Sequence, residues 1–313
     1  MKICVIGAGK WGINHIKTLK NLKSLGGVVD SNPAQIDKIK KLFPNTPCFN
    51  LLENSFQSSF DGYVVSTPPL THLDIIKKLI LNNKPILVEK PLTLSVSSAK
   101  EIQSIIKKSN VKLMVGHLLL FHPAILKIKE MIDDGIIGDL QYMYSNRLKL
   151  GVVRKDENVL WSFAPHDISI FQFFINLFPT KVESLGVAFL QKKIEDTMIT
   201  YLKYPNGVEG HIFVNWLHPS KEYKLVLIGS KGSLSFEDSA QRQSLFFYEK
   251  VSEFKPEVLL ENKPAKEIIY EQSLPLTNEL NYFIDVINGK KIKKASLKEG
   301  IDVVKILNMS KNS

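Results

Sequence analysis

The sequence predicts an α/β fold of two domains: an N-terminal doubly wound parallel sheet, and a C-terminal α+β domain with an open, mostly antiparallel sheet. Up to about residue 118, short β-rich runs alternate with helical periodicity, which is typical of a parallel sheet covered on both faces. Beyond that point apolar and polar residues alternate with a period of two, as in strands with one buried face. We therefore expect domains at residues 1–118 and 119–313.

The first domain should contain at least five strands. The β-rich runs are residues 3–7, 25–30, 63–68, 85–91 and 112–117. Helical periodicity separates them, as in residues 72–83 and 97–110. Ligands of doubly wound sheets bind beyond the carboxyl ends of the strands. Residues that end these runs are therefore the first candidates for a functional site.

The second domain should open with a helix at Pro123–Asp134 and then become rich in strands. The alternating runs are residues 139–150, 181–190, 196–205, 207–217, 223–230 and 233–236. The stretch YPNGV at residues 204–208 predicts a β-hairpin, because Asn-Gly favours tight turns between strands. A late helix is expected around residues 278–289.

Composition excludes several classes of protein. The lysines that dominate the net charge of +10 are interleaved with Asp and Glu, so we expect no nucleic-acid partner. No apolar run reaches the roughly 18 residues of a membrane span, and the N-terminus lacks the features of a signal peptide; we expect a cytoplasmic protein with no membrane partner. Cys4 and Cys48 are the only cysteines, too few for a disulfide framework or a zinc site, so no metal is expected.

The motif GAGKWG, from Gly7 to Gly12, follows the first predicted strand and precedes a helical pattern. Glycines at these positions let the backbone approach a pyrophosphate at a helix N-terminus, as in a Rossmann domain. Asp30 ends the next strand and is placed to accept the ribose hydroxyls, which favours NAD over NADP because a carboxylate repels a 2′-phosphate. We expect NAD as cofactor.

Two further motifs end predicted strands. STPPLTH runs from Ser66 to His72, and Glu89-Lys90-Pro91 follows the fourth run. Pro91 restricts Lys90 to an extended conformation and halts the strand, so the lysine is aimed outward at the ligand edge. The predicted cofactor-binding residues are Gly7, Gly9, Lys10, Trp11, Gly12, Asp30, Ser31, Ser66, Thr67, Pro68, His72, Glu89 and Lys90.

Together with a later histidine, His166, these motifs resemble the Gfo/Idh/MocA family of sugar and inositol oxidoreductases over nearly the whole chain. The resemblance implies NAD(P)-dependent oxidation or reduction of a carbohydrate hydroxyl, with Lys90 and His166 near the reacting carbon. Many members carry Asp four residues before that histidine, where this chain has Ser162, and many carry Arg in the segment that reads HLLLFHP here. The aspartate-dependent part of the usual proton relay is therefore left open.

Within that family, the stretches VGHLLLFHPA, SNRLKLG, ENVLWSFAPHDIS, HIFVNWLHP and VLIGSKG are similar to the branch that acts on nucleotide-linked amino sugars. Its members are the UDP-N-acetylglucosamine and UDP-N-acetylglucosaminuronate 3-dehydrogenases. They make a 3-keto sugar for a partner aminotransferase in the synthesis of surface glycans or lipid A. The resemblance thus implies a nucleotide-sugar substrate, a possible pathway aminotransferase as partner, and a homodimer or homotetramer.

In NVLWSFAPHDIS, Pro165 suits the first turn of a helix that Ser162 or a neighbour can cap. His166 would then lie near the helix N-terminus, where the macrodipole disfavours imidazolium, and Asp167 would complement the dipole. We expect His166 to take the proton of the C3 hydroxyl while Lys90 donates a hydrogen bond to the developing alkoxide; Lys90 as the base is the alternative. These two residues, Lys90 and His166, are the predicted catalytic pair.

The chain has three arginines, Arg147, Arg154 and Arg242. A planar guanidinium suits phosphate or carboxylate recognition, so the first two are candidates for the diphosphate or a sugar carboxylate. The predicted substrate-binding residues are His122, Arg147, Arg154, Asn158, Asp167 and His218. Alternative functions are a ketoreductase acting on a sugar nucleotide, another sugar or inositol dehydrogenase, and a non-catalytic dinucleotide sensor.

Overall fold

The computed structural model describes residues 1–239, 243–250 and 264–310. These residues form two compact units. The first comprises Met1–Phe121 with Ser273–Lys305, and the second comprises His122–Gln272 with Ile306–Ser313. The predicted division at residue 118 took the second domain as continuous to the C-terminus, whereas here the segment Ser273–Lys305 packs with the first unit.

The first unit contains a six-stranded, all-parallel sheet in the order β3-β2-β1-β4-β5-β6. This is the strand order of a Rossmann dinucleotide-binding fold. The strands are β1 Ile3–Ile6, β2 Leu25–Val29, β3 Cys48–Phe49, β4 Gly62–Val65, β5 Ile86–Glu89 and β6 Leu113–Gly116. Strands β1, β4 and β6 are buried along their whole length, because helices that connect parallel strands cover both faces. Sequence periodicity missed only the two-residue strand β3.

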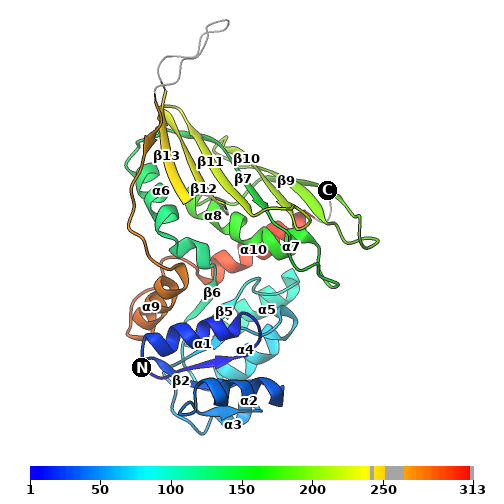
Figure 1. Cartoon of the computed structure of the whole chain (residues 1–313), viewed down its shortest axis with the longest axis vertical. Helices are drawn as coiled ribbons and strands as arrows, with labels where there is room; N and C mark the ends of the chain where they lie inside the picture. Colours follow the sequence, from blue (N-terminus) through cyan, green and yellow to red (C-terminus); the bar gives the residue numbers. More distant parts are fainter. Residues whose placement is uncertain (240–242, 251–263, 311–313) are drawn as a thin grey trace, which may run out of the picture. The chain divides into compact units, whose positions relative to one another are not determined.

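Helices follow the strands of this unit in turn. They are α1 Gly12–Asn21, α2 Pro33–Leu42, α3 Leu52–Ser55, η1 Pro69–Thr71, α4 His72–Ile80, α5 Val96–Lys107 and η2 Leu118–Phe121. Helix α9 Pro275–Ile287 lies beside α1 (Figure 1) and also contacts η2. The next segment joins the sheet edge, since Val115 donates its N–H to the carbonyl of Ala295 at 2.8 Å. The chain therefore returns to the first unit after completing the second.

The second unit is built on an eight-stranded sheet in the order β14-β13-β12-β11-β7-β10-β9-β8. Only the β7/β10 pair is parallel among these described strands, which confirms the mostly antiparallel prediction. The strands are β7 Leu140–Leu148, β8 Lys181–Val187, β9 Thr197–Lys203, β10 Glu209–Asn215, β11 Glu222–Gly229, β12 Gly232–Asp238, β13 Gln243–Glu249 and β14 Lys266–Glu267. The predicted hairpin joins β9 to β10, with Gly207 at φ +84°.

Helices α6 Pro123–Asp133, α7 Val159–Phe163 and α8 Pro165–Ile175 form the second layer of this unit (Figure 1). Helix α7 contacts β9 and β10, and α8 contacts α6 and α7. Burial alternates along β9, β10 and β11, so the sheet has one covered and one open face. Helix α10 Leu297–Met309 begins in the first unit, and its last residues belong to the second.

No helix within the described residues is long and apolar enough to cross a membrane. The same part of the chain holds no group of three or more His, Cys, Asp or Glu side chains that could bind a metal ion. Cys4 and Cys48 are both free, and burial raises the pKa of each thiol.

Candidate active site

The glycine-rich loop between β1 and α1 has the geometry of a phosphate cradle. Gly7 adopts φ +97°, and a Cβ there would lie 2.8 Å from the carbonyl oxygen of Ser66. A Cβ at Gly12 would collide with the carbonyl of Gly7, whereas one at Gly9 would meet nothing within 4 Å. The loop therefore needs glycine for its own packing at two positions and leaves open space at the third, where a ligand can approach the backbone.

Helix α1 begins at this loop, and no side chain of the first turn or N-cap compensates the positive end of its dipole. No side chain caps it, and its first turn holds no acidic residue. Free N–H groups and the helix dipole together favour an anion such as a pyrophosphate. The cradle thus fits a dinucleotide, as the sequence predicted.

Asp30 follows β2 and lies beside the cradle. Its Oδ2 accepts the N–H of Ala8 at 2.6 Å, and its Oδ1 accepts the N–H of Asn32 at 2.8 Å. Each carboxylate oxygen keeps a second lone pair for a further donor. This arrangement supports the prediction that Asp30 binds the ribose hydroxyls. Lys10 and Ser31 are exposed.

The segment after β4 supports the cradle from a second strand. Ser66 donates its hydroxyl to the carbonyl of Gly7 at 2.9 Å, and Thr71 donates to the hydroxyl of Thr67 at 2.7 Å. His72 is fully buried, with Nε2 2.9 Å from the carbonyl of Thr67 and Nδ1 3.1 Å from that of Leu92. Burial lowers the pKa of His72. Its ring therefore joins two loops at the ligand edge. Pro68 is the N-cap residue of η1.

Glu89 and Lys90 end β5 at this edge. The Glu89 carboxylate lies 2.6 Å from Trp11 Nε1 and 2.7 Å from His15 Nε2. Lys90 donates its backbone N–H to Glu89 Oε2 at 3.1 Å. The first unit therefore brings together the residues of all three predicted cofactor motifs: the glycine-rich loop, the Ser66–His72 segment and the Glu89–Lys90 pair.

Several buried polar residues of this unit escaped the sequence prediction, among them His15, His117 and Glu279. Burial, together with the Lys90 charge, lowers the pKa of His117 to about 4. Burial and the nearby Glu89 charge raise the pKa of Glu279 well above its usual range. The signal for His15 was its spacing: it shares the buried face of α1 with Gly12, Ile16 and Leu19, and a polar residue on such a face needs a partner.

His166 lies in the first turn of α8, directly after Pro165. The predicted cap by Ser162 or a neighbour was wrong: Ser162 lies inside α7, and the N-cap of α8 is Ala164, with no side-chain cap hydrogen bond. Asn158 instead caps α7, accepting the N–H of Trp161 at 3.2 Å. The apolar side of α8 is buried as expected, including Ile168, Phe171 and Phe174.

Arg147 and Asp167 form a bidentate ion pair inside the second unit. Arg147 Nε donates to Asp167 Oδ2 at 2.6 Å, and its Nη2 donates to Oδ1 at 3.0 Å. Asp167 is fully buried, and the guanidinium lies over the ring of Tyr223 at 4.1 Å. The bidentate contact uses two of the five guanidinium N–H donors. The pair fixes the first turn of α8, and thereby His166, to strand β7.

The other predicted substrate-binding residues are dispersed. Asn158 donates to Glu195 at 2.8 Å, and Arg154 is half exposed, with Glu157 3.8 Å away. His122 is buried at the start of α6, where Nδ1 accepts the N–H of Ala124 and Nε2 lies 3.2 Å from Gln243. His218 Nδ1 lies 2.8 Å from the carbonyl of Ser220. Arg242 lies outside the described residues. Contacts of these side chains with a substrate stay predictions.

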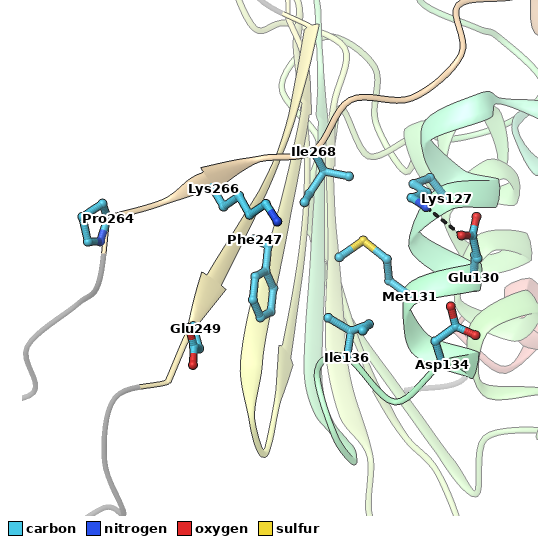
Figure 2. Close-up of a pocket in the computed structure, with 10 residues that line it drawn as sticks. All are labelled: Lys127, Glu130, Met131, Asp134, Ile136, Phe247, Glu249, Pro264, Lys266 and Ile268. Atoms are coloured by element: carbon cyan, nitrogen blue, oxygen red, sulfur yellow. Dashed lines mark hydrogen bonds and ion pairs between the residues drawn. The ribbon is translucent and has the colours of Figure 1, made fainter.

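A separate pocket of about 590 Å³ lies between α6 and strands β13 and β14 (Figure 2). Met131, Ile136, Phe247 and Ile268 form its apolar part, and Lys127 pairs with Glu130 at its rim at 2.6 Å. Its lining includes none of the predicted site residues.

Comparison with known proteins decides the family. The model of the oxidoreductase family's NAD-binding Rossmann fold matches residues 1–117, and the model of the Gfo/Idh/MocA C-terminal domain matches residues 125–235. The chain belongs to the Gfo/Idh/MocA family. Its first unit is therefore the family's NAD-binding domain, and the predictions of an oxidoreductase and of NAD as cofactor are confirmed.

The individual relatives share only a modest sequence identity with this chain. The scyllo-inositol 2-dehydrogenase (NAD(+)) of Bacillus subtilis is 26% identical over 75% of this chain and 73% of its own. The UDP-N-acetylglucosamine 3-dehydrogenase of Acidithiobacillus ferrooxidans is 23% identical over 68% of this chain and 66% of its own. A solved structure of the latter superposes with a TM-score of 0.86 at 19% identity, covering 98% of this chain and 96% of that one. The WlbA dehydrogenase of Bordetella pertussis, solved with NADH and UDP-GlcNAcA, gives 0.80 at 17% identity, covering 100% and 95%.

Proposed function

We propose that this protein oxidises the C3 hydroxyl of a nucleotide-linked amino sugar, UDP-N-acetylglucosamine or its uronic acid, with NAD as oxidant. The 3-keto product would suit a later transamination in the synthesis of a surface glycan or lipid A. One observation carries the proposal: Lys90 ends β5 at the edge that also holds the glycine cradle and Asp30. Similarity to a UDP-N-acetylglucosamine 3-dehydrogenase along the chain supports the choice of sugar.

In the proposed reaction, bound NAD supplies the hydride acceptor. The Gly7–Gly12 loop and the N-terminus of α1 hold the pyrophosphate, and Asp30 holds the ribose. His166 takes the proton of the C3 hydroxyl as the C3 carbon loses its hydride, so a C3 carbonyl forms. Lys90 donates a hydrogen bond to the oxygen on which negative charge develops. The competing assignment gives the proton to Lys90 and leaves His166 to orient the sugar.

The two assignments differ in their kinetics. Lys90→Ala and His166→Ala should both keep NADH affinity, since the phosphates are held elsewhere. Each should lower kcat by about 10²- to 10⁴-fold. If His166→Ala keeps the wild-type kcat while Lys90→Ala is inactive, then Lys90 is the base. If both variants turn over normally, the site has been assigned to the wrong residues.

A second candidate is oxidation of a cyclic polyol, favoured by the 26% identity to a scyllo-inositol 2-dehydrogenase. Purified protein should be incubated with NAD and a panel of UDP- and TDP-sugars, free hexoses and inositols, with a system that reoxidises NADH. Turnover of the amino-sugar nucleotides alone supports the first candidate. Turnover of inositol alone replaces it with the second, and no turnover of any alcohol favours a non-catalytic dinucleotide sensor.

We infer in addition that the chain forms a homodimer or homotetramer through the open face of its second sheet. Leu185 and Ile199 are register partners on adjacent strands and are 78% and 42% exposed. On the same face the rings of Tyr144 and His211 stack with an interplanar angle of 3°. Such an apolar and aromatic face favours burial against a second copy. Sedimentation velocity should show an oligomer at micromolar concentration that Ile199→Lys dissociates; a monomeric wild type would contradict the inference.

A further inference from the structure

The Glu89 carboxylate joins the glycine-rich loop to the segment that carries Lys90. Its Oε1 accepts the indole N–H of Trp11 at 2.6 Å and lies 2.7 Å from Nε2 of His15 on α1. Its Oε2 accepts the backbone N–H of Lys90 at 3.1 Å. One side chain is therefore bonded at the same time to the cofactor loop, to the helix behind that loop and to the residue before Pro91.

Little room is left for this carboxylate to move. Glu89 is 12% exposed and His15 is fully buried. The Trp11 and His15 rings meet edge to face, with centroids 6.2 Å apart. Gly116 is the register partner of Glu89 on β6, and a Cβ there would lie 3.1 Å from Oε2. Any change in the place of the carboxylate therefore has to move either the loop or the Lys90 backbone.

The same unit contains a second buried carboxyl, Glu279, with which the pKa of Glu89 can be compared. Burial raises the pKa of Glu89, but the hydrogen bonds from His15 and Trp11 and the Lys90 charge outweigh burial and hold it below its usual range. Glu279 of α9 is also fully buried, and neither of its oxygens has a hydrogen-bond partner within the described residues. Burial and the Glu89 charge keep the pKa of Glu279 well above its usual range. Two buried carboxyls thus lie in one unit, and their pKa values are shifted in opposite directions.

Resting on the proposed function, we propose that Glu89 is a positioning residue for Lys90: by binding Trp11, His15 and the Lys90 backbone together, it holds the Lys90 ammonium at a fixed place relative to the cofactor loop. Glu89 itself transfers no proton and touches no reacting atom. The kinetic consequence is large because a displacement of about 1 Å in a catalytic group lowers turnover by roughly 100-fold.

The kinetic test makes the same change, Glu to Gln, separately at Glu89 and at Glu279. Glu89→Gln keeps the shape of the side chain, but it removes the charge and can place an amide donor against the Lys90 N–H. We expect kcat to fall about 10- to 100-fold, while the KM for the sugar and the Kd for NADH change by less than about threefold. Glu279→Gln makes the same change at a buried carboxyl without a hydrogen-bond partner among the described residues, and it should leave all three constants unchanged. A Glu89→Gln variant with kcat within about twofold of wild type, or an equal loss in Glu279→Gln, overturns the proposal.

Two measurements do not depend on turnover. The chain has three tryptophans, so in protein labelled with ¹⁵N-indole tryptophan the Trp11 signal is the one that Trp11→Phe removes. Glu89→Gln should shift that signal upfield, and Glu279→Gln should not. Bound NADH should protect Lys90 from acetylation by acetic anhydride in the wild type and in Glu279→Gln, but much less in Glu89→Gln. If the wild type oxidises no alcohol, the proposed function fails; equal protection of Lys90 in all three proteins overturns the positioning role independently.

Discussion

His117 should make the stability of the first unit depend on pH. It ends β6 with no exposed surface, and neither ring nitrogen has a hydrogen-bond partner within the described part of the chain. Burial, together with the Lys90 charge, lowers its pKa from 6.5 to about 4. The ring is therefore neutral in the folded protein under conditions where the unfolded chain already binds a proton.

The sign and size of the effect follow from proton linkage. Between about pH 6.5 and pH 4 the unfolded state binds more protons than the folded state, so the free energy of unfolding falls as the pH is lowered. The difference of 6.5 − 4 = 2.5 in pKa corresponds to about 3 kcal/mol over the whole window. Between pH 7 and pH 5 the same linkage predicts a loss of about 2 kcal/mol.

The perturbation that isolates this effect is His117→Gln, which places a side chain without a titrating group at the same position. Hydrogen exchange of peptides from β5 and β6, measured without nucleotide at pH 7 and pH 5 and corrected for the intrinsic rates, gives the opening free energy of this unit. The wild type should lose about 2 kcal/mol more than the variant on going to pH 5. A difference below about 0.5 kcal/mol would show that His117 is not held neutral by burial.

The remaining predictions concern single side chains with defined contacts. Asp30→Ala should relax the preference for NAD over NADP, measured as the ratio of Kd values by fluorescence titration; tighter NADP binding by the wild type would contradict the ribose assignment. Glu279→Gln should gain stability over the wild type as the pH rises above about 4.5, because a carboxyl with a raised folded pKa stabilises only below its unfolded pKa; an identical pH dependence of exchange in the two proteins would refute this. Arg147→Ala should destabilise the second unit by about 3–5 kcal/mol in denaturant titrations, since it leaves Asp167 buried without its partner. Its matched control, Arg154→Ala, removes a half-exposed guanidinium; it should keep stability and kcat and raise only the KM for the nucleotide sugar.

Sequence patterns predicted the elements whose burial is fixed by their own residues. Strands β1 and β4 are continuous apolar runs because helices cover both faces, and β9 and β10 alternate because one face is open. Strand β3 could not be found in this way: it has two residues, and its pairing with β2 alone makes it a strand. Helix α9 was recognised from its periodicity, but the pattern does not say which surface the apolar stripe meets, so its packing on α1 was missed.

In the candidate site, too, the residues that meet a local requirement were predictable, and those placed by tertiary packing were not. The glycine cradle and Asp30 were predictable because each residue type answers a local requirement, such as a positive φ at Gly7 or a carboxylate after β2. The partners of Arg147 were not predictable, because its bond to Asp167 joins residues 20 apart through the packing of α8 on the sheet. Nor was the cap of α8, since Ser162 has the right chemistry for a cap but lies inside α7, two residues before the N-cap position.

The position of His15 in the sequence carries a further prediction, that of a buried polar partner. It occupies a core position of α1 between Gly12 and Leu19, and a buried imidazole without a hydrogen bond is unfavourable. In a doubly wound sheet, the helix after the first strand packs beside the carboxyl ends of the neighbouring strands, so its partner has to come from a residue that ends one of them. Among the motifs at those ends, Asp30 and Glu89 are the acids, and Glu89 is the one next to the predicted catalytic lysine. A polar residue on the buried face of the first helix therefore predicts a buried polar partner, and the structure identifies that partner as Glu89, 74 residues away.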